Sequence, residues 1–422
     1  MEEGFKWKYR YTALTGLFVF WLVAYMDRMV MSVAIPYIAK DFNLSPVAMG
    51  AVMSSFFFGY ALCQIPGGFL ADKYGARKVM TGTIVFWSVF TAITGMVNNL
   101  FNMIWVRALF GVGEGLVPAA TYKSCATWTP VKQRAFATSI MLCSNCLGPA
   151  LAPLFVAAIM AEWGWRMVFY SLTIPGLLLG LWVWVCLPDN PADKKGISQA
   201  EIDELKTDIS TGAVGAGTKM SFWDIVKLEA VWKSFCILFF QNMTTWGFLS
   251  WQPSYMVMAR GLSLSKMGMA ASLPFFAGTL GWALGGWLSD NPFKHNRKIP
   301  LIAAQWTTSA LLYMSYTAQT LDALLIWQTA SGFTLFMAVG ILFGLPVSTI
   351  SKDITGRAMG FVNTSGQIAG FLSPLIIGYL VQISGGGGAR SFDTAFMFLI
   401  GAMLTASLIT LTFPKSKVET VG

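Results

Sequence analysis

Charged side chains are scarce in this sequence. Only 12% of its 422 residues are Asp, Glu, Lys or Arg, whereas 55% are hydrophobic and the mean hydropathy is +0.59. Soluble domains carry about 25% charged residues, so this composition excludes a soluble globular protein. Histidine is almost absent as well, because His295 is the only one. The scarcity of charge predicts a chain that lies mostly within a lipid bilayer.

The sequence also lacks the patterns of several other protein classes. Its six cysteines lie mostly inside hydrophobic runs, and Cys143 and Cys146 form a CxxC without a second ligand pair, so no metal site is expected. The net charge of +9 comes without zinc-finger spacing or a basic helix, which argues against nucleic acid as a partner. No Gly-x-Ser-x-Gly run or Ser/His/Asp set is present. We therefore expect neither an enzyme nor a bound cofactor.

Long hydrophobic runs are what the sequence has instead. A helix needs ~20 apolar residues to cross the hydrocarbon core, and the runs here are too long and too continuously apolar for the strands of a barrel. We predict an all-α integral membrane protein with twelve transmembrane helices, at about 12–37, 47–71, 79–98, 100–124, 135–160, 167–187, 231–258, 267–289, 299–319, 322–349, 357–382 and 392–413.

Lys and Arg residues are distributed unevenly between the loops. With the amino terminus in the cytoplasm, most of the 29 face inward, which the positive-inside rule favours, so both termini are predicted to be cytoplasmic. In the longest polar stretch, Ser198-Gln-Ala-Glu201 is typical of a capping box that opens a short surface helix. We expect an N-terminal six-helix bundle over 1–188, a cytoplasmic linker over 189–230 and a C-terminal six-helix bundle over 231–422.

A glycine-rich motif occurs twice, about half a chain apart. Gly67-Gly68 precedes Asp72 between predicted spans two and three, and Gly285-Gly286 precedes Asp290 between spans eight and nine. Paired glycines permit close helix approach, and an Asp beside basic residues can form a charge clamp. The recurrence in matching positions indicates two bundles related by duplication. We expect this motif to act as a cytoplasmic gate through Gly68, Asp72, Gly75, Arg77, Lys78 and Asp290.

Four charged residues lie inside predicted spans of the first half. Asp27 and Arg28 interrupt span one, and Arg107 and Glu114 interrupt span four. A charge near the bilayer centre costs ~2.5–3.5 kcal/mol even on the gentler insertion scale, so such residues usually face a wet cavity with a partner. The alternative is a purely structural set of ion pairs. Their confinement to one half favours a pathway for a charged substrate.

The spacing of these residues predicts which of them share a cavity. Arg107 and Glu114 are seven residues apart and lie on one helix face, ~10.5 Å apart along the axis. Adjacent helical residues diverge by about 100°, so Asp27 and Arg28 are expected to contact different neighbours. We predict that Asp27 pairs mainly with Arg107 and that Glu114 pairs with Arg28.

The motifs resemble those of a known family. Gly68 through Lys78 is similar to the signature loop of the major facilitator superfamily, and Tyr25-Met-Asp27-Arg28 resembles the helix-one motif of its anion:cation symporter family. The run from Arg107 to Pro118 resembles that family's helix four, and the resemblance covers the whole chain. The family includes bacterial galactonate, glucarate and hexuronate transporters. Asn145 is a departure, because the galactonate transporters carry Gln there.

The resemblance implies a mechanism for the charged residues. It places helices one and four around a central cavity and couples an organic anion to protons. With Asp27 and Glu114 ionised, the four residues are neutral together; protonation of both leaves two positive charges that an anion can neutralise. We expect Asp27 and Glu114 to carry the protons and Arg28 and Arg107 to bind the substrate, because a guanidinium takes a carboxylate or sulfonate bidentately.

Neutral polar side chains are expected to complete the substrate site. They can hydrogen-bond hydroxyl groups without adding charge, although interhelical hydrogen bonding is the alternative role for each. The stronger candidates are Tyr25, Tyr60, Gln64, Asn145, Asn363 and Gln367, and the weaker ones are Gln241, Asn242, Thr245 and Trp246.

The predicted function is proton-coupled uptake of a small organic anion, such as a sugar acid or another carboxylate or sulfonate, by alternating access across the bacterial inner membrane. A monomer is expected. An exchanger or uniporter that uses the arginines without protons is the alternative, and a non-transporting membrane sensor is a remote one.

Overall fold

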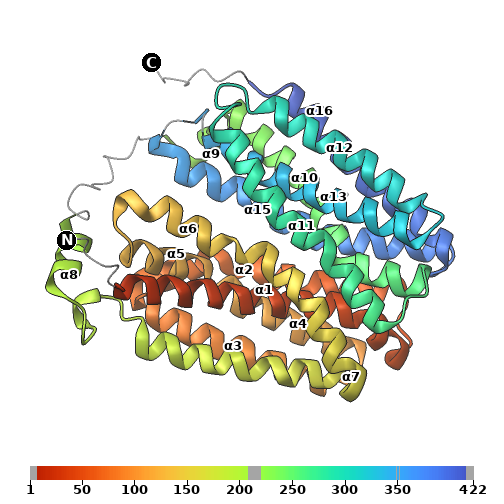
Figure 1. Ribbon diagram of the computed structural model, residues 1–422, viewed down its shortest axis with the longest axis horizontal. Helices are drawn as coiled ribbons and strands as arrows, with labels where there is room; N and C mark the ends of the chain where they lie inside the picture. The colour runs from red at the N-terminus through yellow and green to blue at the C-terminus, as the bar shows by residue number, and fades with distance from the viewer. Residues whose placement is uncertain (1–6, 208–219, 348, 351, 415–422) are drawn as a thin grey trace, which may run out of the picture.

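The computed structural model describes residues 7–207, 220–347, 349–350 and 352–414, and every regular element in this part of the chain is a helix, which confirms the all-α prediction. Figure 1 shows two groups of helices that follow one another along the chain. The first group contains α1 (Tyr9–Phe42), α2 (Pro46–Tyr74), α3 (Ala76–Met96), α4 (Leu100–Gly115), α5 (Pro118–Thr127), α6 (Arg134–Leu142) and α7 (Ser144–Cys186).

The second group begins after two short helices, α8 (Gln199–Thr207) and α9 (Phe222–Lys227). Its members are α10 (Glu229–Ser254), α11 (Leu264–Asp290), α12 (Lys298–Tyr316), α13 (Leu321–Leu342), α14 (Gly344–Val347), α15 (Lys352–Ile383) and α16 (Asp393–Leu411). Short helical turns lie at η1 (Val131–Gln133), η2 (Pro191–Asp193), η3 (Tyr255–Ala259) and η4 (Ala389–Phe392).

Polar residues begin several of the long helices. Ser45, Asn99 and Thr320 each accept a hydrogen bond from the backbone N–H three residues later, at 3.3, 2.9 and 3.3 Å. These bonds satisfy amide groups that the first helical turn leaves without a partner. Pro46 occupies the first position of α2, where the missing N–H is not needed.

Three predicted spans are divided differently in the structure. The span expected over 100–124 consists of α4 and α5, because the helix is interrupted before Pro118. The spans expected over 135–160 and 167–187 fall largely within α7, whose backbone turns at Gly164 with φ 75°, a conformation that glycine adopts without strain. Within the described residues, nine helices have the length and hydropathy to cross a membrane. The total of twelve spans stays a prediction.

Glycines bring helix backbones into direct contact at equivalent places in the two groups. A Cβ atom at Gly111 of α4 would lie 2.1 Å from the carbonyl oxygen of Phe56 on α2. A Cβ atom at Gly281 of α11 would lie 2.0 Å from the carbonyl oxygen of Phe333 on α13. Dispersion contacts between close backbones stabilise helix pairs in a bilayer, where helix association gains little from the hydrophobic effect. Each group therefore contains a tightly packed helix pair at an equivalent place.

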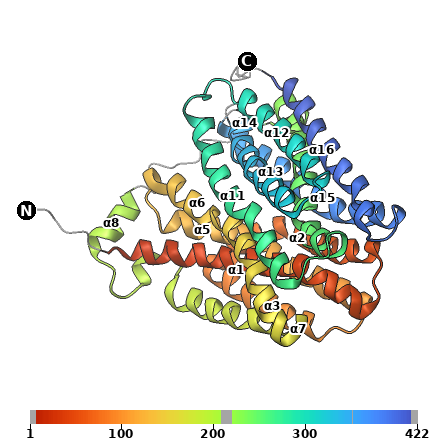
Figure 2. The same ribbon diagram turned by 45° about the vertical axis from the view of Figure 1, so that its right-hand side comes forward.

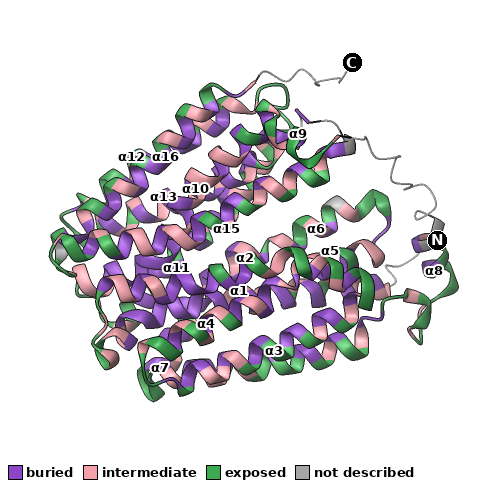
Figure 3. Cartoon of the chain, turned by 180° about the vertical axis from the view of Figure 1, so that it is seen from behind, coloured by how far each residue is buried: buried purple, intermediate pink, exposed green. Residues whose placement is uncertain are grey.

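The two groups touch at one end and diverge toward the other. Pro374 of α15 packs on Gly50 of α2, and Pro153 of α7 packs on Gly268 of α11, at the end away from the termini. Toward the end that carries both termini and α8, the helix axes separate (Figures 1 and 2). Buried residues concentrate where the groups meet and along the inner helices (Figure 3).

Helix α8 is hydrogen-bonded to the first turn of α1. Its Glu201 accepts hydrogen bonds from the backbone N–H groups of Tyr9 and Arg10 at 3.1 and 2.9 Å. Ser198 accepts a hydrogen bond from the Glu201 N–H at 3.3 Å, which forms half of the predicted capping box. The Glu201 carboxylate does not complete that box but caps α1. An acidic group at this position also complements the helix dipole of α1.

Glu204 strengthens the same contact. Its carboxylate oxygens accept hydrogen bonds from the Lys8 ammonium and the Arg10 guanidinium, each at 2.8 Å. These bonds hold the pKa of Glu204 below its ordinary value of 4.5. The beginning of the linker is thus attached to the first helix group; its residues 208–219 lie outside the described part.

Candidate functional site

Arg28 lies midway along α1 and forms an ion pair with Glu114 of α4. Its Nη2 and Nε atoms donate to the same oxygen, Glu114 Oε2, at 2.7 and 3.3 Å. Both side chains are buried, with 8% and 2% of their surface exposed. The structure therefore contains the predicted Arg28–Glu114 pair, which keeps two charges neutral within the bundle.

Aromatic rings surround the guanidinium of Arg28. Its Cζ atom lies 4.8 Å from the ring centroids of both Tyr25 and Phe56, and 5.0 Å from that of Tyr60. Trp246 of α10, in the second group, contributes a fourth ring at 5.8 Å. Ring faces stabilise a cation electrostatically and fix a planar guanidinium better than a flexible ammonium. Arg28 is thus held by side chains from both helix groups.

The predicted ion pair between Asp27 and Arg107 is absent. Both carboxylate oxygens of Asp27 are buried without a hydrogen-bond partner, as is Arg107 Nε. The Arg107 guanidinium instead stacks 4.3 Å from the Phe110 ring and lies 5.8 Å from the Phe56 ring. The prediction placed these residues on the correct helices, but the Arg107 side chain adopts a rotamer in which its guanidinium lies against aromatic rings rather than against Asp27. Among the residues that the structure describes, no carboxylate lies within ion-pair distance of its charge.

Both arginines line one cavity between the two helix groups. It is narrow, with a volume of about 20 Å³, and α10 of the second group forms one side of it with Trp246, Leu249 and Ser250. The remaining lining residues are mostly apolar and come from α1, α2 and α4. A largely apolar chamber that holds two cations can attract a small anion, because low polarity strengthens each charge–charge contact. In this structure the chamber has a volume of about 20 Å³, so it must widen to admit an anion larger than a water molecule.

The predicted neutral wall lies outside this chamber. Gln64 of α2, Asn145 of α7, and Asn363 and Gln367 of α15 are half-buried and do not line it. Tyr25 and Tyr60 connect the two regions through their contacts with Arg28. The substrate roles of all six stay predictions.

The weaker candidates on α10 have different positions. The buried Gln241 accepts a hydrogen bond from Gln305 of α12 at 3.0 Å, and Thr245 donates to the Gln241 carbonyl at 3.0 Å. Asn242 donates to the Leu238 carbonyl at 3.0 Å. Only the bond from Gln305 joins α10 to another helix, whereas the other two lie within α10. Trp246 reaches the chamber.

The sequence analysis did not predict two polar residues of the chamber. Ser32 and Ser250 supply its neutral hydroxyl groups, and both are more than nine-tenths buried. Each lies one helical turn, four residues, after a residue that was considered, Arg28 or Trp246. That spacing is the signal that could have found them.

The repeated motif forms a charge pair in each half. Asp72 pairs with Lys123 of α5 at 2.9 Å, and Asp290 pairs with Arg297 at 3.3 Å. The packing glycines are Gly67 and Gly285, since a Cβ atom at either would lie 2.4 or 2.3 Å from a carbonyl oxygen of the neighbouring helix. The predicted Gly68 makes no such approach, because its nearest neighbour would be a side-chain carbon at 3.9 Å.

Asp189, at the start of the linker, contacts the other end of this motif. It accepts a hydrogen bond from the Arg77 N–H at 2.9 Å and packs against Gly75, whose φ of 87° requires glycine. Arg77 stacks on Trp184 at 4.3 Å. Lys78 lies beside the Gly82 face of α3, in a surface hollow.

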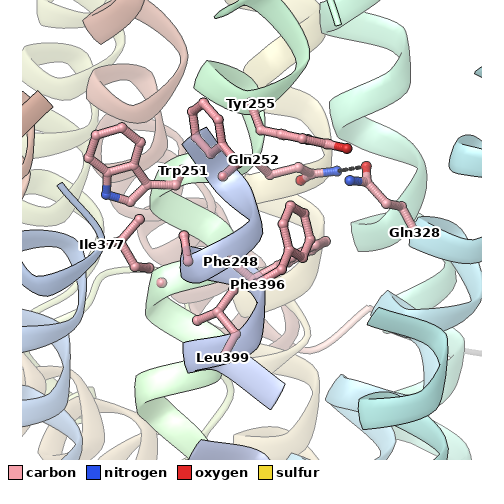
Figure 4. Close-up of a pocket in the computed structure, with 11 residues that line it drawn as sticks. Phe248, Trp251, Gln252, Tyr255, Gln328, Ile377, Phe396 and Leu399 are labelled. Atoms are coloured by element: carbon pink, nitrogen blue, oxygen red, sulfur yellow. Dashed lines mark hydrogen bonds between the residues drawn. The ribbon is translucent and has the colours of Figure 1, made fainter. Parts of the chain in front are cut away.

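A second cavity, in the other helix group, carries no charge. Figure 4 shows aromatic and aliphatic side chains around Gln252, which donates to Gln328 at 3.2 Å. In the described part of the chain, no charged side chain lines this cavity, so it has no cation that could pair with an anion. The two-arginine chamber is therefore the stronger candidate site.

Relatives that are named as transporters match almost the whole chain. The probable galactarate/D-glucarate transporter GarP of Escherichia coli (strain K12) is 32% identical over 418 residues, which cover 92% of this chain and 91% of that protein. The probable sulfoacetate transporter SauU of Cupriavidus necator is 32% identical and covers 95% of this chain and 94% of its own length. The hexuronate transporter of Bacillus subtilis (strain 168) is 27% identical, with 94% and 93% covered.

Solved structures show the same fold at lower identity. A bacterial homologue of the human lysosomal transporter Spinster superposes with a TM-score of 0.79 at 18% identity, covering 99% of this chain and all of that one. A D-xylose–proton symporter superposes with a TM-score of 0.77 at 16% identity, with 98% and 100% covered.

The family model of the Major Facilitator Superfamily matches residues 17–374. The protein is therefore a multi-pass integral membrane protein of the bacterial inner membrane, and a transporter rather than an enzyme, as predicted. The match spans both helix groups and the two-arginine chamber between them, and the chain belongs to the Major Facilitator Superfamily.

Proposed function

We propose that this transporter takes up a small organic anion, such as a sugar acid or another carboxylate or sulfonate, together with protons. The observation that carries this proposal is the chamber between the helix groups, where Arg28 is paired with Glu114 and Arg107 has no carboxylate partner. The names of the relatives, which include galactarate, glucarate, hexuronate and sulfoacetate transporters, support an anionic substrate.

Exchange of partners couples the anion to protons in this proposal. An anion that binds Arg28 displaces the Glu114 carboxylate, which then favours a proton because a buried carboxylate without a cation is costly. Asp27, whose oxygens already lack partners, is the second proton carrier. The anion and the protons thus favour each other's binding reciprocally. After release, Glu114 re-forms its pair with Arg28 and the empty site is neutral.

The two helix groups would rock about this chamber. We assign residues 1–188 and 231–422 to two six-helix bundles, 189–230 to a cytoplasmic linker, and both termini to the cytoplasm. The structure then corresponds to the state that is closed at the outer face, where α2 meets α15 and α7 meets α11. The protein would act as a monomer, with Asp72 and Asp290 in the cytoplasmic gate.

Uptake into proteoliposomes tests the proposal. Purified protein is reconstituted, and accumulation of glucarate, galacturonate and sulfoacetate is measured with and without an imposed pH gradient. We expect the gradient to drive accumulation in the wild type, whereas Glu114→Gln and Asp27→Asn abolish the pH-driven part. Asp322→Asn, which removes an exposed carboxylate at the start of α13, is the matched control.

The competing function is anion exchange without protons. It predicts uptake that depends on an anion inside the vesicle and ignores the pH gradient. If both carboxyl variants retained full pH-driven accumulation, the assignment of Asp27 and Glu114 as proton carriers would be wrong.

A further inference from the structure

The two chamber arginines share one aromatic ring. The Cζ atoms of Arg28 and Arg107 lie 4.8 and 5.8 Å from the centroid of Phe56. Their guanidinium carbons are therefore less than about 11 Å apart, a span that a short molecule with an acid group at each end can bridge through charge-assisted hydrogen bonds. The separation and the shared cavity make these arginines one two-point site.

The surroundings of the two arginines differ. Arg28 is neutralised by Glu114, which uses one oxygen, Oε2, to accept both N–H groups and leaves Oε1 without a partner. Arg107 is 2% exposed, and its guanidinium lies against the rings of Phe110 and Phe56. No carboxylate of the described residues lies within ion-pair distance of it. A negative group is therefore missing at Arg107 even while Arg28 is satisfied.

Charge balance then specifies the guest. When Asp27 and Glu114 are protonated, the chamber holds two uncompensated guanidinium groups. A guest with one negative charge neutralises one of them and leaves the other buried and unpaired, which is strongly unfavourable. A guest with two negative charges neutralises both. The site should therefore select a guest with two negative charges, because a guest with one charge leaves a buried guanidinium unpaired, which costs free energy.

The chamber wall positions the two acid groups. Ser32 of α1 and Ser250 of α10 line the same cavity as Arg107, and their hydroxyl groups can donate to an oxyanion. Serine and arginine together supply the donors that one carboxylate or sulfonate needs, and they come from both helix groups. The other acid group would lie at Arg28, in place of the Glu114 oxygen. Apolar side chains, including Met53 and Phe57, enclose the space between.

We propose that the transported anion is a short dianion, a dicarboxylate or a sulfonate-carboxylate, with one acid group on Arg107 and the hydroxyl groups of Ser32 and Ser250, and the other on Arg28. This inference rests on the proposed anion transport and adds the number of acid groups to it.

Binding of matched ligands to the purified full-length protein tests the inference. Glucarate is compared with gluconate, which has the same carbon count and one acid group fewer, and sulfoacetate is compared with methanesulfonate. Affinities are measured by isothermal titration. We expect each two-acid ligand to bind at least about tenfold more tightly than its partner, because a charge-assisted contact contributes enough free energy for such a ratio.

Substitution of Arg107 shows where the second acid group binds. In Arg107→Gln, we expect the affinity ratio within each pair to fall to about two or less, mainly through weaker binding of the two-acid ligand. Lys266→Gln, which removes an exposed charge on α11, should leave the ratios unchanged. A loss of affinity that is equal for one-acid and two-acid ligands would overturn the assignment of Arg107.

The wild-type ratios alone decide whether a dianion is preferred, even if Arg107→Gln fails to fold. Ratios near one, with binding and uptake of the one-acid ligands intact, would overturn the dianion inference and leave anion transport standing. If none of the four ligands binds and no organic anion is taken up by proteoliposomes, the proposed function itself fails.

Discussion

The shape of the Arg28 side chain is as important as its charge. A planar guanidinium lies among four aromatic rings and gives two N–H groups to one oxygen of Glu114. A lysine ammonium carries the same charge but has neither the flat face nor the two parallel donors. The local structure therefore distinguishes arginine from lysine at this position.

We expect Arg28→Lys to weaken anion binding about tenfold or more, because the retained charge cannot replace stacking and a bidentate contact. The measurement is substrate affinity by isothermal titration, with folding checked by thermal unfolding. Arg166→Lys is the control, since Arg166 forms an exposed pair with Asp41 and such surface pairs contribute little. Unchanged affinity in Arg28→Lys would show that only its charge matters.

At the residue scale, sequence reasoning found the charges but not all of their contacts. Helical phase was sufficient to pair Arg28 with Glu114, because both point into the same interior. It failed for Arg107, since the choice between Asp27 and the face of Phe110 depends on a rotamer that spacing does not encode. Ser250 was missed because a serine among apolar residues has no distinctive pattern of its own.

At the scale of helices, the two copies of the Gly-Gly motif use their first glycine for packing. A Cβ atom at Gly285 would lie 2.3 Å from the Met337 carbonyl oxygen, whereas one at the adjacent Gly286 meets nothing within 4 Å. Backbone atoms cannot move aside as a flexible side chain does. Gly286 should therefore tolerate a larger side chain, whereas Gly285 should not.

We expect Gly285→Ala to destabilise the protein by ~1–3 kcal/mol through overpacking against the backbone of α13. Gly286→Ala is the matched control and should be neutral or stabilising by up to ~1 kcal/mol, because alanine favours a helix over glycine. Thermal unfolding of the detergent-solubilised variants measures both. Equal stability of the two variants would contradict the close approach of α11 and α13.

The attachment of α8 to α1 depends on ionised Glu204. Because its folded pKa is lower than the ordinary 4.5, this carboxylate stabilises the contact at pH values above about 4.5, and the stabilisation is lost as the pH falls through the lower folded value. The contact is therefore expected to weaken only in acid.

Hydrogen exchange of the α8 amides measures this. We expect protection to be high at neutral pH and to fall in acid, after correction for the intrinsic rate, and Glu204→Gln to lower protection already at neutral pH. Asp193→Asn, in an exposed turn of the same linker, should leave protection unchanged. A wild-type profile without pH dependence would refute the role of Glu204.

The contact between Glu201 of α8 and the first turn of α1 shows why the docking of helices is harder to predict than their formation. The Ser198–Glu201 spacing correctly located the start of α8. Yet the Glu201 carboxylate bonds to the amide groups of Tyr9 and Arg10, nearly two hundred residues earlier in the chain. Local spacing carries no information about such a partner, because the meeting of the two segments is decided by tertiary packing.

At the scale of the whole molecule, the helix groups are in contact from the middle of the bundle, where Phe57 packs on Trp246, to the end away from the termini. There a Cβ atom at Gly268 of α11 would lie 2.6 Å from the Ala157 side chain and 2.9 Å from the Pro153 carbonyl oxygen of α7. A larger residue at Gly268 would therefore penalise the state in which this end is closed.

We expect Gly268→Val to shift the population toward the state that is open at this end. Lys40 and Lys266 are exposed residues of different helix groups near this end. Double electron–electron resonance between spin labels at these two positions should report a longer distance in Gly268→Val than in the wild type. Gly401→Val in α16 is the control, because nothing lies within 4 Å of a Cβ atom there. An unchanged distance distribution in Gly268→Val would show that this contact does not set the conformation.

Direct backbone contact at Gly111 and Gly281 leaves no adjustable side chains between the paired helices of either group. Each pair must then move as one rigid unit, so relative motion takes place between the helix groups rather than within these pairs. Substitutions inside the pairs should lower the yield of folded protein, whereas substitutions where the groups meet should change the lifetime of each transporter state.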